Sequence, residues 1–381
     1  MAAASDYMRL AIKLARRGYG ATSPNPMVGA VLVKAGRIIG RGWHHRAGEP
    51  HAEIEALKDA QKHGRVPKGA TLYVSLEPCC TQGRTPPCTG AIVAAGIKRV
   101  VVGATDPNPR HCGRAFAILR RAGIAVTHGL MGAECERLNE AFNHWIVHRT
   151  PLVTVKAAMT LDGKIATASG ESKWITGEPA RQYGMKLRQG ADAIVVGINT
   201  ILADDPSLTF RPAEERASST PPRQLRRVVL DSLARTPLKA KVVGDEQAAL
   251  TTVVVSERAP RKRVAALAAR VRVLVAPSHA GSTHAPEIDL SWLLRTLGAE
   301  NVTSLLVEGG GEVNGSFLQQ RLAQRIAFFY APKVLGGRDS RRAVGGDGAA
   351  GPGEVLELTR LEWRRLGEDW LLEAATGNPT S

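Results

Sequence analysis

Two kinds of apolar spacing follow one another along the first 148 residues. Apolar residues three and four apart predict helices, whereas short apolar runs between turn residues predict strands. Pro78 suits a first helical position, which predicts a helix with Cys79 in its first turn. The expected helices cover 7–15, with Ser5 or Asp6 as its cap, and 51–62, 91–95, 115–121 and 134–147; the expected strands cover 28–33, 37–43, 71–76, 99–103 and 124–127.

The same alternation restarts near Arg149 and indicates a second α/β unit, so we expect domains at 1–148 and 149–376. A terminal hairpin over 356–374 is expected to turn at Gly367–Asp369, and the polar stretch 212–226 is expected to be a loop. The expected strands of this unit cover 152–158, 193–196, 227–231, 252–255, 271–275 and 304–307, and the expected helices cover 178–189, 260–269, 289–297 and 311–321.

Composition agrees with two globular domains. The chain has 381 residues, and 44% of them are hydrophobic. It contains no run of 18 apolar residues and no secretory signal, so we expect a cytoplasmic protein with no membrane segment. Five cysteines, three of them within ten residues, are typical of metal ligands in a reducing compartment and not of a disulfide framework.

The net charge of +16 suits phosphorylated small molecules or nucleic acid. A base deaminase that holds tRNA on the basic second half is therefore one alternative. Such an enzyme needs aromatic side chains to stack a flipped base, yet aromatics make up only 4% of this chain and do not alternate with its arginines. A phosphorylated small molecule is the favoured partner, with no nucleic acid.

The segment from His51 to Cys88 carries the candidate chemistry. His51, Cys79 and Cys88 offer three zinc ligands, and a catalytic zinc keeps its fourth position for water. Helix N-termini would favour the thiolate forms of the cysteines. Glu53, two residues after His51, can carry protons without binding the metal, in the order His-x-Glu, Pro-Cys, Cys of zinc deaminases.

Two alternatives stay open at this site. A structural zinc, as in a zinc-stabilised binding module, would need a fourth protein ligand, which His44 or His45 could supply. Cys80 is a spare thiol beside Cys79. The basic loop between Cys79 and Cys88 could contact a substrate phosphate or be a surface insertion.

Several longer motifs in one order closely resemble the bifunctional riboflavin-biosynthesis deaminase/reductase family. The resemblance extends over about 330 residues. It rests on the segments Pro24–Gly29, Gly48–Glu53, Glu77–Cys88, Asp106–Pro109, Lys156–Gly163, Ser169–Thr176, Leu202–Arg211 and Glu308–Gly310. The implied fold is α/β, with an N-terminal cytidine-deaminase-like three-layer domain followed by a dihydrofolate-reductase-like domain.

For the first domain, the resemblance implies zinc-dependent deamination of 2,5-diamino-6-(5-phosphoribosylamino)pyrimidin-4-one. His51, Cys79 and Cys88 match the family's zinc ligands, and one zinc per chain is implied. Glu53 matches its proton shuttle. Asn25 and His44 match residues that line its pyrimidine pocket.

For the second domain, the resemblance implies NADPH-dependent reduction of the ribosyl group to ribityl, in a homo-oligomer (dimer or tetramer). Lys156 and Asp204 are candidates for polarising the sugar, although each could instead belong to a structural ion pair. A Gly309–Gly311 turn that opens a helix would bind phosphate, although such a turn can also be a plain loop. Cofactor positions are matched by Ala158, Trp174, Thr200, Asp204, Ser232, Gly310, Gly311, Glu312, Val313, Asn314, Gly315 and Ser316, and substrate positions by Ser172, Arg188, Leu208, Arg211 and Glu308.

The chain departs from the family pattern at two places. Thr81 stands where the family usually has histidine, which removes a polar contact near the deaminase pocket. His111 and Cys112 stand in a loop where the family usually carries valine and glycines. These two residues could suggest a second metal, but a lone pair of this kind is more often part of a loop or core.

Overall fold

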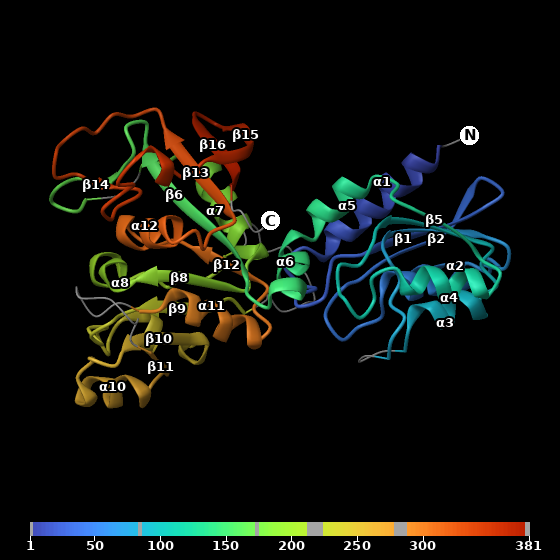
Figure 1. Cartoon of the computed structure of the whole chain (residues 1–381), viewed down its shortest axis with the longest axis horizontal. Helices are drawn as coiled ribbons and strands as arrows, with labels where there is room; N and C mark the ends of the chain where they lie inside the picture. The colour runs from blue at the N-terminus through green and yellow to red at the C-terminus, as the bar shows by residue number, and fades with distance from the viewer. Residues whose placement is uncertain (1–2, 83–85, 172–174, 212–223, 278–287, 378–381) are drawn as a thin grey trace. The chain divides into compact units, whose positions relative to one another are not determined.

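The chain forms two compact units, Met1–Arg149 and Thr150–Ser381, in this computed structural model (Figure 1). The structure describes residues 3–82, 86–171, 175–211, 224–277 and 288–377. Within these residues, no helix combines the length and the apolar character needed to cross a bilayer.

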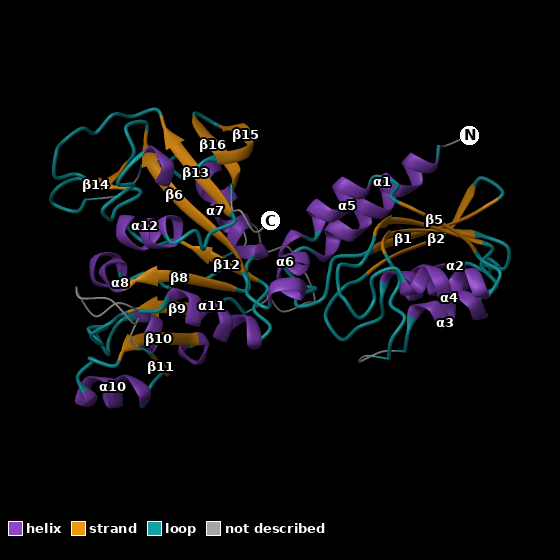
Figure 2. Ribbon diagram, viewed as in Figure 1, coloured by secondary structure: helices purple, strands orange, loops and turns teal. Residues whose placement is uncertain are grey.

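The first unit is a five-stranded sheet between two layers of helices (Figure 2). Its strands lie in the order β2-β1-β3-β4-β5, antiparallel from β2 to β3 and parallel from β3 to β5. They are β1 (Gly29–Lys34), β2 (Arg37–Trp43), β3 (Thr71–Leu76), β4 (Arg99–Ala104) and β5 (Ala125–His128). The apolar faces of α1 (Ala4–Ala15) and α5 (Gly132–Leu138) pack on one side, and α2 (Ala52–Lys62), α3 (Cys88–Ala94) and α4 (Arg114–Arg121) pack on the other; α6 (Glu140–His148) follows α5.

Strand glycines, among them Gly29 and Gly42, bring helices unusually close to this sheet. A Cβ at Gly29 would lie 1.9 Å from the carbonyl oxygen of Ala11 in α1. A Cβ at Gly42 would lie 2.3 Å from the carbonyl oxygen of Ala52, the first residue of α2. Only glycine allows this approach, which seats the N-terminus of α2 directly on β2.

The second unit is built on a nine-stranded sheet in the order β11-β10-β9-β8-β12-β6-β13-β16-β15. The strands from β11 to β13 are parallel, and β16 and β15 add an antiparallel edge. They are β6 (Leu152–Thr160), β8 (Ala193–Gly197), β9 (Arg226–Leu230), β10 (Thr251–Ser256), β11 (Arg272–Ala276), β12 (Ser304–Val307), β13 (Arg325–Ala331), β15 (Leu358–Leu366) and β16 (Asp369–Thr376). A small separate sheet pairs β14 (Arg341–Arg342) with β7 (Lys164–Ala166).

Helices cover both faces of this larger sheet, as expected for parallel strands buried on both sides. One core contains side chains of α11 (Leu290–Ala299) and α12 (Gly311–Gln319). The opposite core contains side chains of α8 (Ile198–Asp204), α9 (Lys241–Gly244) and α10 (Arg261–Ala268). Helix α7 (Glu178–Gly190) packs with β13 and β16 through a smaller cluster.

Most predicted elements are present, but three predictions were wrong. No helix begins at Pro78, because residues 77–80 are loop and the helix starts at Cys88. The predicted helix 134–147 is two helices, since Asn139 leaves helical geometry and its side chain exchanges hydrogen bonds with the backbone of Met27. Ala3, and not Ser5 or Asp6, is the N-cap of α1; the carboxylate of Asp6 accepts from its backbone N–H.

Candidate active sites

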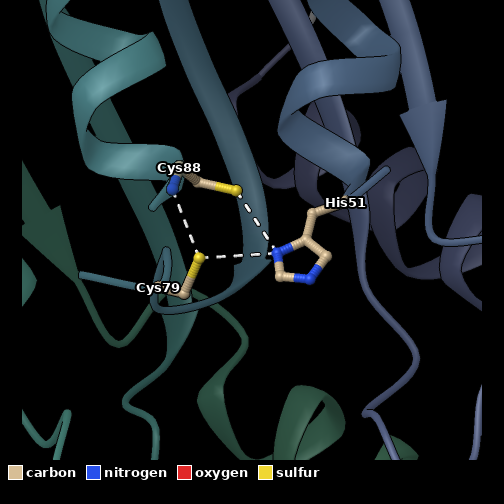
Figure 3. A group of neighbouring side chains, drawn as sticks. All are labelled: His51, Cys79 and Cys88. Atoms are coloured by element: carbon tan, nitrogen blue, oxygen red, sulfur yellow. Dashed lines mark hydrogen bonds between the residues drawn. The ribbon is translucent and has the colours of Figure 1, made fainter. Parts of the chain in front are cut away.

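The predicted metal ligands of the first unit converge (Figure 3). Nδ1 of His51 lies 3.4 Å from Sγ of Cys79 and 3.4 Å from Sγ of Cys88, and all three ligand atoms lie within 4.8 Å of one another. Tetrahedral zinc with ordinary Zn–S and Zn–N bonds separates its ligand atoms by about 3.5–3.8 Å. The three side chains therefore fit zinc with little movement.

Each ligand comes from a different element. His51 is the N-cap of α2, Cys79 lies in the loop after β3, and Cys88 is the first residue of α3. The backbone N–H of Cys88 donates to Sγ of Cys79 at 3.2 Å, and the carbonyl of Cys79 accepts from Thr89. The N-terminus of α3 thus serves both cysteines, which corrects the expectation that Cys79 lies on a helix of its own.

Hydrogen bonds favour a thiolate within this cluster. A hydrogen bond from the Cys88 thiol, together with those from His51 and the Cys88 backbone, lowers the pKa of Cys79 to about 4. The hydrogen bond with Cys79 also raises the pKa of His51. A thiolate beside an imidazole and a second thiol together form the nitrogen and sulfur donor set that, among the common divalent metals, suits zinc best.

Glu53 is a buried carboxyl beside the cluster, in the first turn of α2, and its residue is only 3% exposed. Burial and the charge of Cys79 raise its pKa to about 7, although His51 and a hydrogen bond from Cys88 oppose the rise. A carboxyl with this pKa exchanges protons readily at neutral pH, which suits general acid–base work.

The predicted pocket residues adjoin the ligands. Nδ2 of Asn25 lies 3.1 Å from Nε2 of His44, and Nδ1 of His44 lies 3.1 Å from the carbonyl of Pro50. The rings of His44 and His51 meet edge to face with centroids 5.2 Å apart. Burial lowers the pKa of His44, which favours the neutral imidazole. His44 is therefore a neighbour of the cluster and not part of its closely spaced donor set.

Glu77 is a residue whose structural role the sequence did not reveal. Its buried carboxylate follows β3 and accepts from the backbone N–H groups of Asp106, Gly113 and Ala115 at 3.2, 2.9 and 3.0 Å. Glu77, which lies two positions before Cys79, thereby caps α4 and holds the loop after β4 in place. The only sequence signal was its place in the Glu-Pro-Cys motif.

The second unit gathers three of the predicted substrate residues. Arg188 on α7 makes a bidentate ion pair with Glu308 at 2.9 Å for each nitrogen, and its third nitrogen donates to the carbonyl of Thr209. That carbonyl belongs to the residue after Leu208, which is buried and adopts φ +52°. Nζ of Lys156 on β6 lies 3.7 Å from the same carboxylate. Burial opposes ionisation of Glu308, but Arg188 and Lys156 together lower its pKa to about 2.

Most predicted cofactor positions lie at or beyond the C-terminal ends of adjacent parallel strands. Thr200 and Asp204 lie on α8 after β8, Ser232 follows β9, and Gly310–Ser316 begin α12 after β12; Ala158 lies on β6. This edge is where open α/β sheets bind their ligands.

Close packing holds the first turn of α12 against this edge. A Cβ at Gly197 or Gly309 would clash with the side chain of Val313, at 2.8 and 2.5 Å. A Cβ at Gly310, the N-cap, would meet nothing within 4 Å. The start of α12 is therefore open at Gly310, whereas Gly311 is packed, since a Cβ there would lie 2.4 Å from the carbonyl oxygen of Arg342.

Three predicted residues are not placed with the rest. Arg211 is exposed at the end of a described segment. Ser172 and Trp174 lie outside the described residues. Their predicted contacts with substrate and cofactor stay predictions.

Two sequence families match the chain. Residues 1–104 match the cytidine and deoxycytidylate deaminase zinc-binding region, and residues 151–372 match the RibD C-terminal domain. The riboflavin biosynthesis protein RibD of Actinobacillus pleuropneumoniae is 41% identical over 374 residues, which cover 98% of this chain and 96% of that protein. The Escherichia coli K12 protein of the same name is 41% identical over 369 residues, or 95% and 96% of the two chains.

Solved structures agree with this similarity. Acinetobacter baumannii RibD, form 1, has a TM-score of 0.85 at 37% identity and covers 98% of this chain and 99% of its own. A diaminohydroxyphosphoribosylaminopyrimidine deaminase/5-amino-6-(5-phosphoribosylamino)uracil reductase from Thermotoga maritima has a TM-score of 0.81 at 35% identity, with 98% of each chain covered.

Proposed function

This chain belongs to the RibD family of riboflavin biosynthesis proteins, and on that premise we propose that it carries out both reactions named for the Thermotoga maritima relative. The first is deamination of 2,5-diamino-6-(5-phosphoribosylamino)pyrimidin-4-one. The second is NADPH-dependent reduction of the ribosyl product to 5-amino-6-(5-phosphoribitylamino)uracil. The expected fold, a cytidine-deaminase-like layer structure followed by a reductase of the dihydrofolate-reductase type, is confirmed.

The observation that carries the deaminase assignment is the His51, Cys79 and Cys88 cluster with Glu53 buried beside it. Zinc, when bound, lowers the pKa of its water, so that hydroxide is available as the nucleophile at neutral pH. Glu53 accepts a proton at its carboxylate and returns it to the departing amino group, which leaves as ammonia. Asn25 and His44, which contact each other beside the cluster, are assigned to the wall of the pyrimidine pocket.

In the second unit, we assign the substrate to the Arg188–Glu308 pair and Lys156. NADPH, when bound, supplies the hydride that reduces the sugar. The ammonium of Lys156 lies 3.7 Å from the carboxylate of Glu308, and we assign it to donate a hydrogen bond to the sugar oxygen as the ring opens. The helix start at Gly310 and Gly311 is assigned to cofactor phosphate, with Thr200, Asp204 and Ser232 around it.

The test separates the two activities in one protein. Supplied with the diaminopyrimidinone phosphate and NADPH, the enzyme should release ammonia and then oxidise NADPH. Glu53→Gln should release ammonia at least about 100-fold more slowly and keep its zinc, because general acid–base groups contribute about 10²–10⁴-fold. It should still oxidise NADPH when given deaminated substrate. Ammonia release at the unaltered rate would refute the role of Glu53.

We also propose a cytoplasmic homo-oligomer. Thiolate zinc ligands persist in reducing compartments. The edge strand β15 and its partner β16 expose Leu361, Trp363 and Trp370 at 53%, 56% and 46%, an apolar surface that a second copy would cover. Trp363→Glu should lower the mass measured by sedimentation, whereas an unchanged mass would exclude this edge as the contact.

A further inference from the structure

One arginine of the second unit is entirely buried. Arg227, the second residue of β9, is the largest fully buried side chain in the described part of the chain. Its guanidinium makes a bidentate ion pair with Asp245, at 2.6 and 2.7 Å, and donates from Nε to Oγ1 of Thr251 at 2.9 Å. It also donates to the carbonyls of Val242 and Ser207, at 3.2 and 3.0 Å. These hydrogen bonds give every N–H donor of the guanidinium a partner, which a buried charge requires.

The bond to Ser207 differs from the others in where it leads. Val242 lies on α9, Asp245 follows α9, and Thr251 begins β10, so these three partners come from the stretch of chain that directly follows β9. Ser207 lies before β9, in the segment 205–209 that follows α8. Arg227 therefore ties the segment 205–209 to a rigid anchor inside the sheet layer.

The residue after Ser207 has a strained backbone. Leu208 is buried, yet it adopts φ +52°, a left-handed conformation that is unfavourable for a residue with a Cβ. The carbonyl of Ser207 accepts from Arg227, and the carbonyl of Thr209 accepts from Arg188 at 3.0 Å. Two guanidinium groups thus hold the backbone on both sides of Leu208. Such strain persists only where the surroundings enforce it, and it is typical of functional sites.

The two arginines differ in what else they can contact. The side chain of Arg227 is 0% exposed, and its donors are all occupied within the fold. The side chain of Arg188 is 13% exposed, and its hydrogen bonds to Glu308 and Thr209 use three of its five N–H donors. Arg188 can therefore meet a ligand, whereas Arg227 can act only through the backbone.

We propose that Arg227 is a positioning residue for the reductase substrate. By holding the carbonyl of Ser207, it keeps Leu208 in its left-handed conformation, and this places the carbonyl of Thr209 against Arg188. That carbonyl and Glu308 then fix the guanidinium of Arg188 from two sides. The assignment rests on the proposed reductase function, in which Arg188 binds the substrate.

Three variants separate positioning from stability. Arg227→Met removes the contact with Ser207 together with the ion pair. Asp245→Asn removes the charge of the ion pair and keeps the contact with Ser207, because one guanidinium nitrogen reaches both partners. The double variant loses the contact but leaves no unpaired buried charge, so it should be more stable than Asp245→Asn.

The measurement is the KM for the deaminated substrate at saturating NADPH, beside the stability of the second unit in urea. Arg227→Met and the double variant should each raise this KM about tenfold, the effect of one misaligned hydrogen bond to a charged group. Asp245→Asn should leave it unchanged in spite of its lower stability. The dissociation constant of NADPH should be unchanged in all three variants, because the assigned cofactor positions lie outside the segment 205–209.

Several results would overturn the assignment. They are a KM that follows stability across the three variants, an unchanged KM in the double variant, and an equal loss of affinity for NADPH. Failure of both Arg227 variants to fold would also overturn it, since the arginine would then be needed for the fold itself. Absence of NADPH oxidation by the unaltered protein with deaminated substrate would instead refute the reductase function.

Discussion

Glu308→Gln removes a negative charge that lies between two cations in the second unit. The side chain of Glu308 is 11% exposed, and those of Arg188 and Lys156 are 13% and 21% exposed. Glutamine has nearly the same shape as glutamate, so the substitution leaves packing intact. It removes the negative charge that faces the guanidinium of Arg188. The expected loss is therefore electrostatic.

Its size follows from the pKa. A carboxyl whose pKa falls from 4.5 to about 2 on folding contributes about 3 kcal/mol at neutral pH. Breaking a buried ion pair by removing one partner costs about 3–5 kcal/mol, which is the same order. We expect Glu308→Gln to lose about 3 kcal/mol of stability in the second unit at pH 7.

The pH dependence has a definite sign. Because folding lowers the pKa of Glu308, its contribution is complete above about pH 4.5 and is lost as the pH falls from 4.5 toward 2. The stability difference between the unaltered protein and Glu308→Gln should therefore be large at pH 7 and much smaller at pH 3.

Pulse-labelled hydrogen exchange in urea measures this within one unit. Peptides from β6 and β12 should lose protection at lower urea in Glu308→Gln, whereas peptides from β3 and β4 give an internal reference. Glu178→Gln breaks an exposed pair with Arg181 and is the matched control, for which we expect no measurable shift. Equal behaviour of the two variants, or a difference that persists undiminished at pH 3, would refute the reasoning.

Three further outcomes are expected. Cys88→Ser should lower bound zinc, measured by atomic emission, and reduce ammonia release at least about 100-fold while reductase activity remains. Saturating NADPH should raise the melting temperature of the unaltered protein, since a ligand that binds only the folded state stabilises it; no shift would contradict the reductase assignment. Gly29→Ala should destabilise the first unit by about 1–3 kcal/mol through the clash with Ala11, whereas Gly90→Ala, with nothing within 4 Å, should not destabilise it in chemical denaturation.

The sequence predicted the zinc cluster because its residue types are rare and their order is specific. His51, Cys79 and Cys88 lie together as expected, and Asn25 and His44 contact each other. Apolar runs located most strands because turn residues bounded these runs. These signals are local, and each can be read without knowing what lies across the fold.

The failures have a non-local cause. Nothing in the sequence around Asn139 indicates that its side chain forms hydrogen bonds with the backbone of Met27. This contact interrupts the predicted helix. The strand β13 was missed because no Gly, Pro, Asn, Asp or Ser separates its apolar run from the helix before it. The meeting of His111 with Thr81 likewise depends on a turn that Glu77 fixes from another strand.

Two buried carboxylates, each directly after a parallel strand, show how the sites differ. Glu77 follows β3 and accepts hydrogen bonds from backbone N–H groups. These hydrogen bonds can break only if the backbone between β4 and α4 moves. Glu308 follows β12 and is held by Arg188 and Lys156, whose side chains can turn without disturbing the backbone. A substrate can therefore compete for the partners of Glu308 but not for those of Glu77. On this argument Glu77 shapes the first site from outside it, whereas we propose that Glu308 belongs to the binding surface of the second.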